Sequence, residues 1–149
     1  MWQVTWKKRT KGNNMPTTHF FYENNVLCAD SVPLTDIVRQ YGTPLYVYSK
    51  AALTKNYQAY ASACKKHQHP DAPALVCFSV KSNSNLAVLK ILGDLGAGFD
   101  IVSGGEFSRV IAAGCDPRKV IFSGVGKTAE EIRFALRHDI LCFNIESLA

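Results

Sequence analysis

The chain of 149 residues is 47% hydrophobic and 19% charged, which is typical of one globular domain and excludes a disordered or collagen-like protein. Its formal charge of +5 comes almost entirely from residues 1–14, which hold four basic residues and no acidic one, whereas the rest of the chain holds 13 basic and 12 acidic residues. A nearly neutral body gives no reason to expect a nucleic-acid partner.

No apolar run approaches the roughly 18 residues that a membrane span requires, and no apolar stretch of the signal-peptide kind follows the basic start. We therefore expect a soluble, cytoplasmic protein without a membrane partner. The five cysteines are odd in number, far apart and without a CxxC spacing. They are expected to be reduced and mostly buried, with neither a disulfide framework nor a metal site.

Residues 1–14 form a basic tail that we expect to be disordered or to be a mis-assigned start, because Met15 opens the first patterned segment. Residues 15–48 are predicted to form a separate layer. Its expected elements are the two strands of a hairpin and one helix, at residues 19–25, 26–29 and 34–41.

From about Leu45 onward, short apolar runs alternate with amphipathic stretches, a pattern typical of buried parallel strands and covering helices. Strands are predicted at residues 45–48, 74–80, 98–102, 119–123 and 140–145. Helices are predicted at residues 51–66, 86–95, 106–113 and 129–137. Ser103 with Glu106, and Thr128 with Glu131, have the spacing of capping boxes at the starts of the last two helices.

The strand and helix units recur at a nearly constant spacing. Four phenylalanines at strand positions that we expect to be equivalent are separated by 21, 23 and 21 residues: Phe78, Phe99, Phe122 and Phe143. Short, even loops favour the successive addition of neighbouring strands, as in a (β/α)8 barrel, over a doubly wound sheet. The expected fold class is therefore α/β, with residues 49–149 forming the N-terminal half of a TIM-type barrel.

Polar residues follow the expected strands, where β/α folds place functional groups: Lys81, Asp100, residues 123–127, and Asn144 with Glu146. Three side chains are weighed as candidates for chemistry. Lys81 directly follows an apolar strand and would be partly removed from water, which favours the neutral amine that attacks a carbonyl carbon; a solvated surface charge is the alternative. Asp100 is placed either to orient such an amine or a cofactor, or to cap a helix. Glu106 is first of all the second half of a capping box.

Two phosphate-loop patterns overlap after the fourth expected strand. A Walker A loop requires a glycine five positions before Gly126, where Ile121 stands, so the sequence excludes a P-loop nucleotide triphosphatase. Gly124, Gly126 and Ala129 do satisfy the G-x-G-x-x-A fingerprint between a strand and a helix. A dinucleotide-binding module therefore remains an alternative function, although this fingerprint normally follows the first strand of its fold.

The stretch FSVKSNSNLAVLKILGDLGAGFDIVSGGE resembles the pyridoxal-phosphate attachment region of the group IV decarboxylases, and within them that of the diaminopimelate decarboxylases most closely. The resemblance extends upstream to FFYENNVL and YGTPLYVY and downstream to KVIFSGVGKT and CFNIES, so that it covers residues 19–149. Ornithine and arginine decarboxylases and alanine racemases share the fold but not this set of motifs.

The resemblance implies roles for individual residues. Lys81 matches the lysine that binds pyridoxal phosphate covalently, Asp100 matches an aspartate near that lysine and the cofactor, and Glu106 matches a carboxylate in the same neighbourhood. The implied reaction is the decarboxylation of meso-2,6-diaminopimelate to L-lysine, a step of lysine biosynthesis. Within the same class, the alternative substrates are ornithine and arginine.

The resemblance also implies a homodimer in which a C-terminal β-domain follows the barrel. In the family, the phosphate loop, the acid at the pyridine nitrogen and the residues donated by the partner all come later than Ala149, and GVGKT is not that phosphate loop. We therefore expect an N-terminal fragment that lacks the β-domain and is inactive alone. Residues 15–48 are expected to pack with that domain in the whole enzyme.

Overall fold

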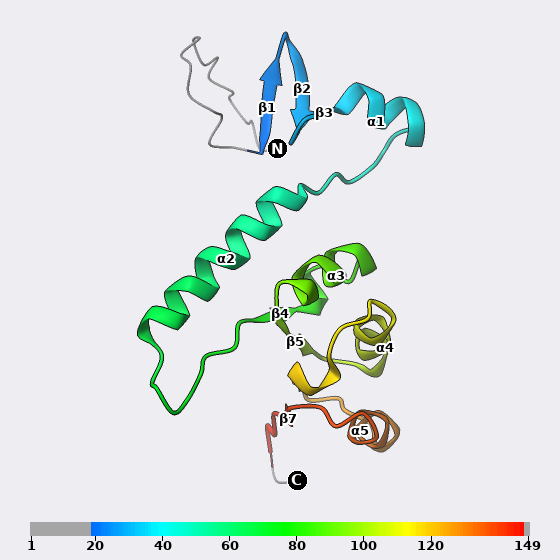
Figure 1. Ribbon diagram of the computed structural model, residues 1–149. Helices are drawn as coiled ribbons and strands as arrows, with labels where there is room; N and C mark the ends of the chain where they lie inside the picture. The colour runs from blue at the N-terminus through cyan, green and yellow to red at the C-terminus, as the bar shows by residue number, and fades with distance from the viewer. Residues whose placement is uncertain (1–18, 148–149) are drawn as a thin grey trace. The chain divides into compact units, whose positions relative to one another are not determined.

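The computed structural model describes residues 19–147, so the basic tail expected at residues 1–14 lies outside the described residues (Figure 1). Two compact units divide the chain between Leu45 and Tyr46. Each unit has a sheet of its own, antiparallel in the first and parallel in the second.

The first unit is a three-stranded sheet followed by a short helix. Its elements are β1 (Phe20–Glu23), β2 (Val26–Ala29), β3 (Val32–Pro33) and α1 (Leu34–Tyr41). Asn24 and Asn25 have φ values of 48° and 65°, the left-handed conformation that a two-residue hairpin turn requires and that asparagine tolerates well. The predicted hairpin and helix are confirmed, whereas the two residues of β3 are too few to leave a pattern in the sequence.

The second unit is a four-stranded parallel sheet in the order β4-β5-β6-β7. Its elements are α2 (Lys50–His67), β4 (Cys77–Ser79), the 3-10 helix η1 (Val80–Ser82), α3 (Leu86–Asp94), β5 (Gly98–Ile101), α4 (Gly104–Ala112), the 3-10 helix η2 (Pro117–Lys119), β6 (Val120–Phe122), α5 (Ala129–Leu136) and β7 (Cys142–Phe143). Helices α3, α4 and α5 lie on one side of the sheet (Figure 1). Because consecutive strands are neighbours, the order is that predicted for a β/α barrel and not that of a doubly wound sheet.

All neighbouring strands of the parallel sheet share one register, in which paired residues are 21 positions apart. One row of partners across the sheet consists of Ser79, Asp100, Ile121 and Cys142. Phe99 pairs with Val120 and not with Phe122, so the predicted equivalence of the four phenylalanines is wrong at this step. Phe122 lies two residues after Val120 on β6 and therefore on the same face of the sheet as Val120.

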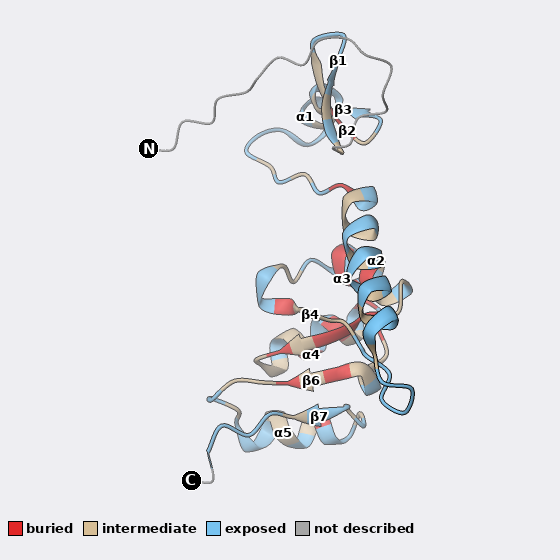
Figure 2. Ribbon diagram, turned by 90° about the vertical axis from the view of Figure 1, so that its left-hand side faces the viewer, coloured by how far each residue is buried: buried red, intermediate tan, exposed pale blue. Residues whose placement is uncertain are grey.

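The two faces of this sheet differ in character. The face covered by helices carries the hydrophobic core, which Figure 2 shows as buried segments along the strands. Its fully buried strand residues are Phe99, Ile101, Val120 and Phe122. They pack with helical residues such as Leu89 and Phe107. By alternation, the opposite face carries mostly small or polar side chains, among them Cys77, Ser79, Asp100 and Cys142. In a β/α barrel this face points into the barrel.

The strand predicted at residues 45–48 is wrong. No strand is assigned there, and among the described strands β4 pairs only with β5. Tyr46 is 90% exposed. A strand forms only where a neighbouring strand satisfies its backbone N–H and C=O groups, so an apolar and aromatic segment without that neighbour stays irregular.

The cysteines depart in part from the prediction. All five are free, as expected, but only Cys28 and Cys115 are buried, and Cys142 is exposed. The apolar run around Cys142 misled the prediction because β7 has one neighbouring strand among those described, β6. Within residues 19–147, no helix combines the length and the apolar character needed to cross a membrane.

Candidate active site

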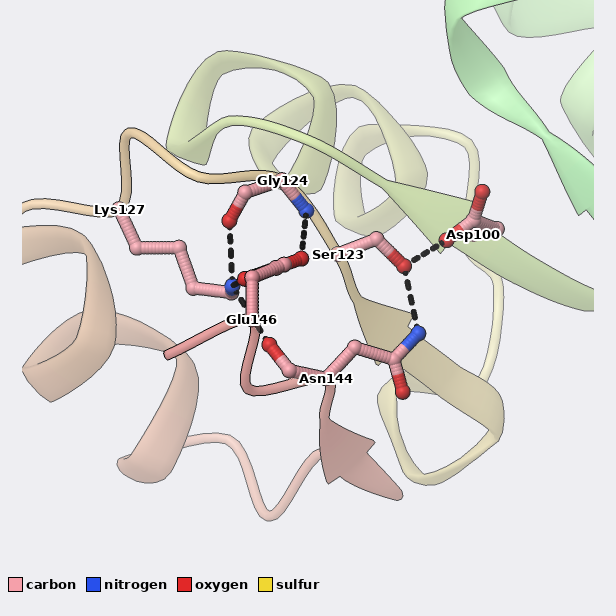
Figure 3. Close-up of polar contacts among 6 residues, drawn as sticks. All are labelled: Asp100, Ser123, Gly124, Lys127, Asn144 and Glu146. Carbon is pink, nitrogen blue, oxygen red and sulfur yellow. Dashed lines mark hydrogen bonds and ion pairs between the residues drawn. The ribbon is translucent and has the colours of Figure 1, made fainter. Parts of the chain in front are cut away.

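Polar side chains from several strands meet at the carboxyl ends of the parallel sheet, the edge at which β/α folds place their functional groups. In this cluster Ser123 lies between Asn144 and the carboxylate of Asp100 on β5 (Figure 3). Asp100 Oδ1 accepts a hydrogen bond from the hydroxyl of Ser123 at 2.5 Å, and Asp100 Oδ2 accepts one from the hydroxyl of Ser79 at 3.4 Å. The side-chain amide of Asn144 donates to Ser123 Oγ at 2.9 Å. Donors on both oxygens fix the plane of the carboxylate.

The constant register brings these residues together. Ser79 is the direct partner of Asp100 across the β4–β5 ladder. Ser123 and Asn144 follow β6 and β7, are 21 residues apart, and continue the same face of the sheet. Both were predicted to lie among the polar residues at strand ends, but neither was predicted to contact Asp100. Repeated steps of 21 residues forward from Lys81 reach both of them, and this was the signal that could have linked them to the site.

Lys81 lies in η1, immediately beyond the end of β4, and its side chain is exposed. The expectation that it is partly removed from water is therefore wrong, because the 3-10 turn carries the chain past the edge of the sheet. Within residues 19–147, the side chain of Lys81 makes no hydrogen bond or ion pair, and the structure does not place its amine in contact with Asp100. The amine is accessible to a carbonyl compound from solution.

Glu106 holds the turn between β5 and α4. Its Oε2 accepts from the backbone N–H of Val102 at 2.9 Å, while its own N–H donates to Ser103 Oγ at 3.2 Å. Of the two hydrogen bonds in the predicted capping box, the one from the N–H of Glu106 to Ser103 Oγ is present. The other, to the carboxylate of Glu106, comes from the N–H of Val102 instead of that of Ser103. The carboxylate of Glu106, in the first turn of α4, thus binds the loop that follows β5.

The start of α5 carries the complete capping box that was predicted, between Thr128 and Glu131. Glu131 Oε2 accepts from the N–H of Thr128 at 2.9 Å, and Oε1 accepts from the N–H of Gly104 at 2.7 Å. The N–H groups of Gly104 and then of Thr128 hold the pKa of the Glu131 carboxyl below its usual value. One side chain thus joins the first turns of α4 and α5.

The loop from β6 to α5 does not form a phosphate cradle. The N–H of Gly124 donates to Glu146 Oε1 at 3.0 Å, and the N–H of Thr128 donates to Glu131. A pyrophosphate would have to displace two carboxylates of the chain itself, and the consecutive strand order provides no crevice of the dinucleotide-binding kind. The geometry therefore argues against the dinucleotide-binding alternative.

Comparison with known proteins assigns the chain to a class. Residues 50–149 match the family described as the pyridoxal-binding domain of the pyridoxal-dependent decarboxylases. The chain belongs to this family, whose cofactor is pyridoxal phosphate. For a metal, by contrast, no group of three or more His, Cys, Asp or Glu residues in the described part of the chain is suitably placed.

The relatives narrow the class. The chain is 54% identical over 127 residues to the diaminopimelate decarboxylase of Vibrio cholerae, which covers 85% of this chain and 29% of the relative. It is also 54% identical over 128 residues to that of Pseudomonas aeruginosa, covering 86% of this chain and 30% of the relative. The chain thus spans less than a third of the length of these curated relatives.

A solved structure agrees with the fold. The diaminopimelate decarboxylase from M. jannaschii in complex with L-lysine superposes with a TM-score of 0.81 and 32% identity, over 86% of this chain and 30% of that one. The predicted α/β class and barrel-type arrangement of strands and helices are confirmed.

Proposed function

We propose that the product of this gene is a pyridoxal-phosphate-dependent decarboxylase that converts meso-2,6-diaminopimelate to L-lysine and carbon dioxide. The observation that carries the proposal is the 54% identity to diaminopimelate decarboxylases over 85% of the chain. An alignment of 127 residues within 149 necessarily includes the segment from β4 to α4, which holds Lys81 and Asp100. The L-lysine in the M. jannaschii complex is the product that this reaction would release.

The residues at the carboxyl ends of β4 and β5 fit the cofactor. Lys81 presents an exposed primary amine, the group that would hold the aldehyde of the cofactor. Asp100, on the neighbouring strand, offers a carboxylate whose orientation two hydroxyl groups fix. When bound, pyridoxal phosphate withdraws the electron pair that the departing carboxylate leaves on the substrate.

Each of the three predicted site residues then has a distinct task in the proposed enzyme. Lys81 would hold the cofactor through its amine and would yield that place to the substrate amine. Asp100 orients the charged groups around that amine. Glu106 holds the loop after β5 and so supports Asp100 from outside the site.

The first test is the absorbance of the gene product incubated with pyridoxal phosphate. A band at about 420 nm is expected for the cofactor bound through a lysine, and Lys81→Ala is expected to abolish it. Lys90→Ala is the matched control, because Lys90 lies on α3 with its ammonium ion-paired to Asp94 at the exposed surface. A band that persists in Lys81→Ala would refute the assignment of Lys81.

Substrate choice is tested by carbon dioxide release. Release from meso-2,6-diaminopimelate, with little from ornithine or arginine, is the expected result. Preference for ornithine or arginine would move the protein to another branch of the same family and overturn the proposed substrate.

We also propose that the enzyme works as a homodimer in the cytoplasm. The support is the resemblance of the sequence to the group IV decarboxylases. Sedimentation velocity of the purified gene product would measure the assembly, and a monomer that decarboxylates the substrate would contradict it.

A further inference from the structure

Lys127 is unusually enclosed for a lysine, since its side chain is only 8% exposed. It lies between β6 and α5 and takes no part in the proposed chemistry. Its Nζ donates to the carbonyl oxygen of Gly124, to the carbonyl oxygen of Asn144 at 2.7 Å and to Glu146 Oε2 at 3.1 Å (Figure 3). An ammonium group has three protons, so each finds an acceptor.

Glu146 completes the arrangement from the segment after β7. Its second oxygen, Oε1, accepts from the N–H of Gly124 at 3.0 Å. The hydrogen bond from Lys127 is the main reason why the pKa of the Glu146 carboxyl lies below its usual value. Both backbone polar groups of Gly124 are thereby fixed. We call Lys127, Glu146 and the backbone of Gly124 and Asn144 the clasp.

The clasp holds the two residues that position Asp100. Ser123, which donates to Asp100, directly precedes Gly124 in the chain. Asn144, which donates to Ser123, has its own carbonyl oxygen bound by Lys127. The segments after β6 and β7 therefore cannot move apart without breaking a contact to a nearly buried ammonium group.

We propose that Lys127 and Glu146 are positioning residues that set the orientation of the Asp100 carboxylate through Ser123 and Asn144. The inference rests on the proposed function in one respect, that Asp100 faces the cofactor. Neither Lys127 nor Glu146 touches Asp100 in the described structure, so their effect passes through the hydrogen bonds of the two intermediates.

The test uses the full gene product with Lys127→Met, which keeps an unbranched apolar side chain one atom shorter and removes the charge and the donors. Lys90→Met is the matched control, because it breaks an ion pair of 2.9 Å, to Asp94, that is largely exposed. In the crystal structure of Lys127→Met, the hydrogen bond from Ser123 to Asp100 is expected to be lost. The dissociation constant of pyridoxal phosphate is expected to rise by about tenfold or more, against less than about twofold for Lys90→Met.

A double-mutant cycle separates positioning from a general loss of stability. If Lys127 acts through Asp100, Lys127→Met is expected to change cofactor affinity by less than about twofold when Asp100→Asn is already present. An equal effect in both backgrounds would overturn the proposal, as would a lowered melting temperature with unchanged affinity and an intact contact between Ser123 and Asp100.

A milder variant keeps the test decisive where Lys127→Met does not fold. Glu146→Gln leaves Lys127 both backbone carbonyl acceptors and removes the ion pair, and its single side-chain oxygen accepts from either Lys127 or the N–H of Gly124 but not from both. The same loss of affinity through Asp100 is expected, to a smaller extent. Failure of the wild-type protein to bind pyridoxal phosphate would refute the proposed function. In that event the position of Asp100 in the crystal structures of the variants still decides whether the clasp orients it.

Discussion

Gly98 at the start of β5 shows how closely the strands of the parallel sheet approach their surroundings. A Cβ added there would lie 2.6 Å from Cys77 Sγ and 2.6 Å from the backbone oxygen of Lys119. The thiol can rotate away, whereas the carbonyl belongs to the segment that leads into β6 and cannot. The position therefore requires glycine for space and not for an unusual backbone angle.

We expect Gly98→Ala to lower the free energy of unfolding by about 1–3 kcal/mol, because the added methyl group forces the backbone apart. Gly126→Ala is the matched control, since nothing lies within 4 Å of its Cβ position. That control is expected to change stability by no more than about 0.5 kcal/mol. Urea denaturation of the gene product measures both, and equal midpoints for the two variants would contradict this account.

Individual site residues were predictable where a charged residue interrupts or ends an apolar strand. Lys81 directly follows such a strand and Asp100 lies within one, so both are visible in the sequence. Ser123 and Asn144 are ordinary loop residues, and their contacts to Asp100 depend on the register of the strands. The exposure of Lys81 was not predictable, because a single 3-10 turn after β4 leaves no periodic pattern.

Among the elements, α4 and α5 are joined at their first turns by Glu131. Its two oxygens serve different N–H groups, those of Gly104 and Thr128. Because the pKa of this carboxyl is lowered, its contribution to stability is complete at any pH above the ordinary pKa of a glutamate. The contribution is lost as the pH falls through the lowered pKa.

We expect Glu131→Gln to be less stable than the wild type at neutral pH, because glutamine can accept only one of the two hydrogen bonds and turns a donor toward the other N–H. The difference is expected to shrink in acid, where the wild-type carboxyl is protonated. Glu130→Gln is the matched control, an exposed neighbour on the same turn. Melting temperatures from pH 7 to pH 3 measure the difference in stability between Glu131→Gln and the wild type. A difference that stays constant across that range would contradict the role of the Glu131 carboxylate in joining α4 and α5.

Helices were more predictable than strands. Caps and glycines at helix ends are local signals, and all five predicted helices are present, with ends that differ by at most two residues. Strand ends depend on where the partner strand stops, so the predicted seven-residue strand at 74–80 is reduced to the three residues of β4. For the same reason the segment at 45–48 has apolar character without forming a strand.

At the scale of the whole chain, the boundary between the two compact units falls within a segment without helix or strand, from Gly42 to Ser49. Tyr46 lies in this segment and is 90% exposed. A protease needs an exposed stretch of chain that can adopt an extended form, and regular secondary structure opposes that change.

We therefore expect chymotrypsin at low concentration to cut first after Tyr46, with mass spectrometry as the readout. Tyr46→Ser is expected to slow the formation of that fragment. Tyr60→Ser is the matched control, because Tyr60 is 69% exposed but lies within α2. Early cleavage after Tyr60 would contradict the expectation.

The constant register of the parallel sheet limits how the length of this sequence can vary. An insertion of one residue within β6 would turn Ser123 toward the helices and Phe122 toward the polar face, and so exchange a hydrogen-bond donor of Asp100 for an aromatic ring. The stretch before Cys77, at residues 69–75, is exposed and outside the ladder. Gains and losses of residues among natural homologues should therefore be tolerated there, whereas those within β4, β5, β6 or β7 should be rare or occur in compensating pairs.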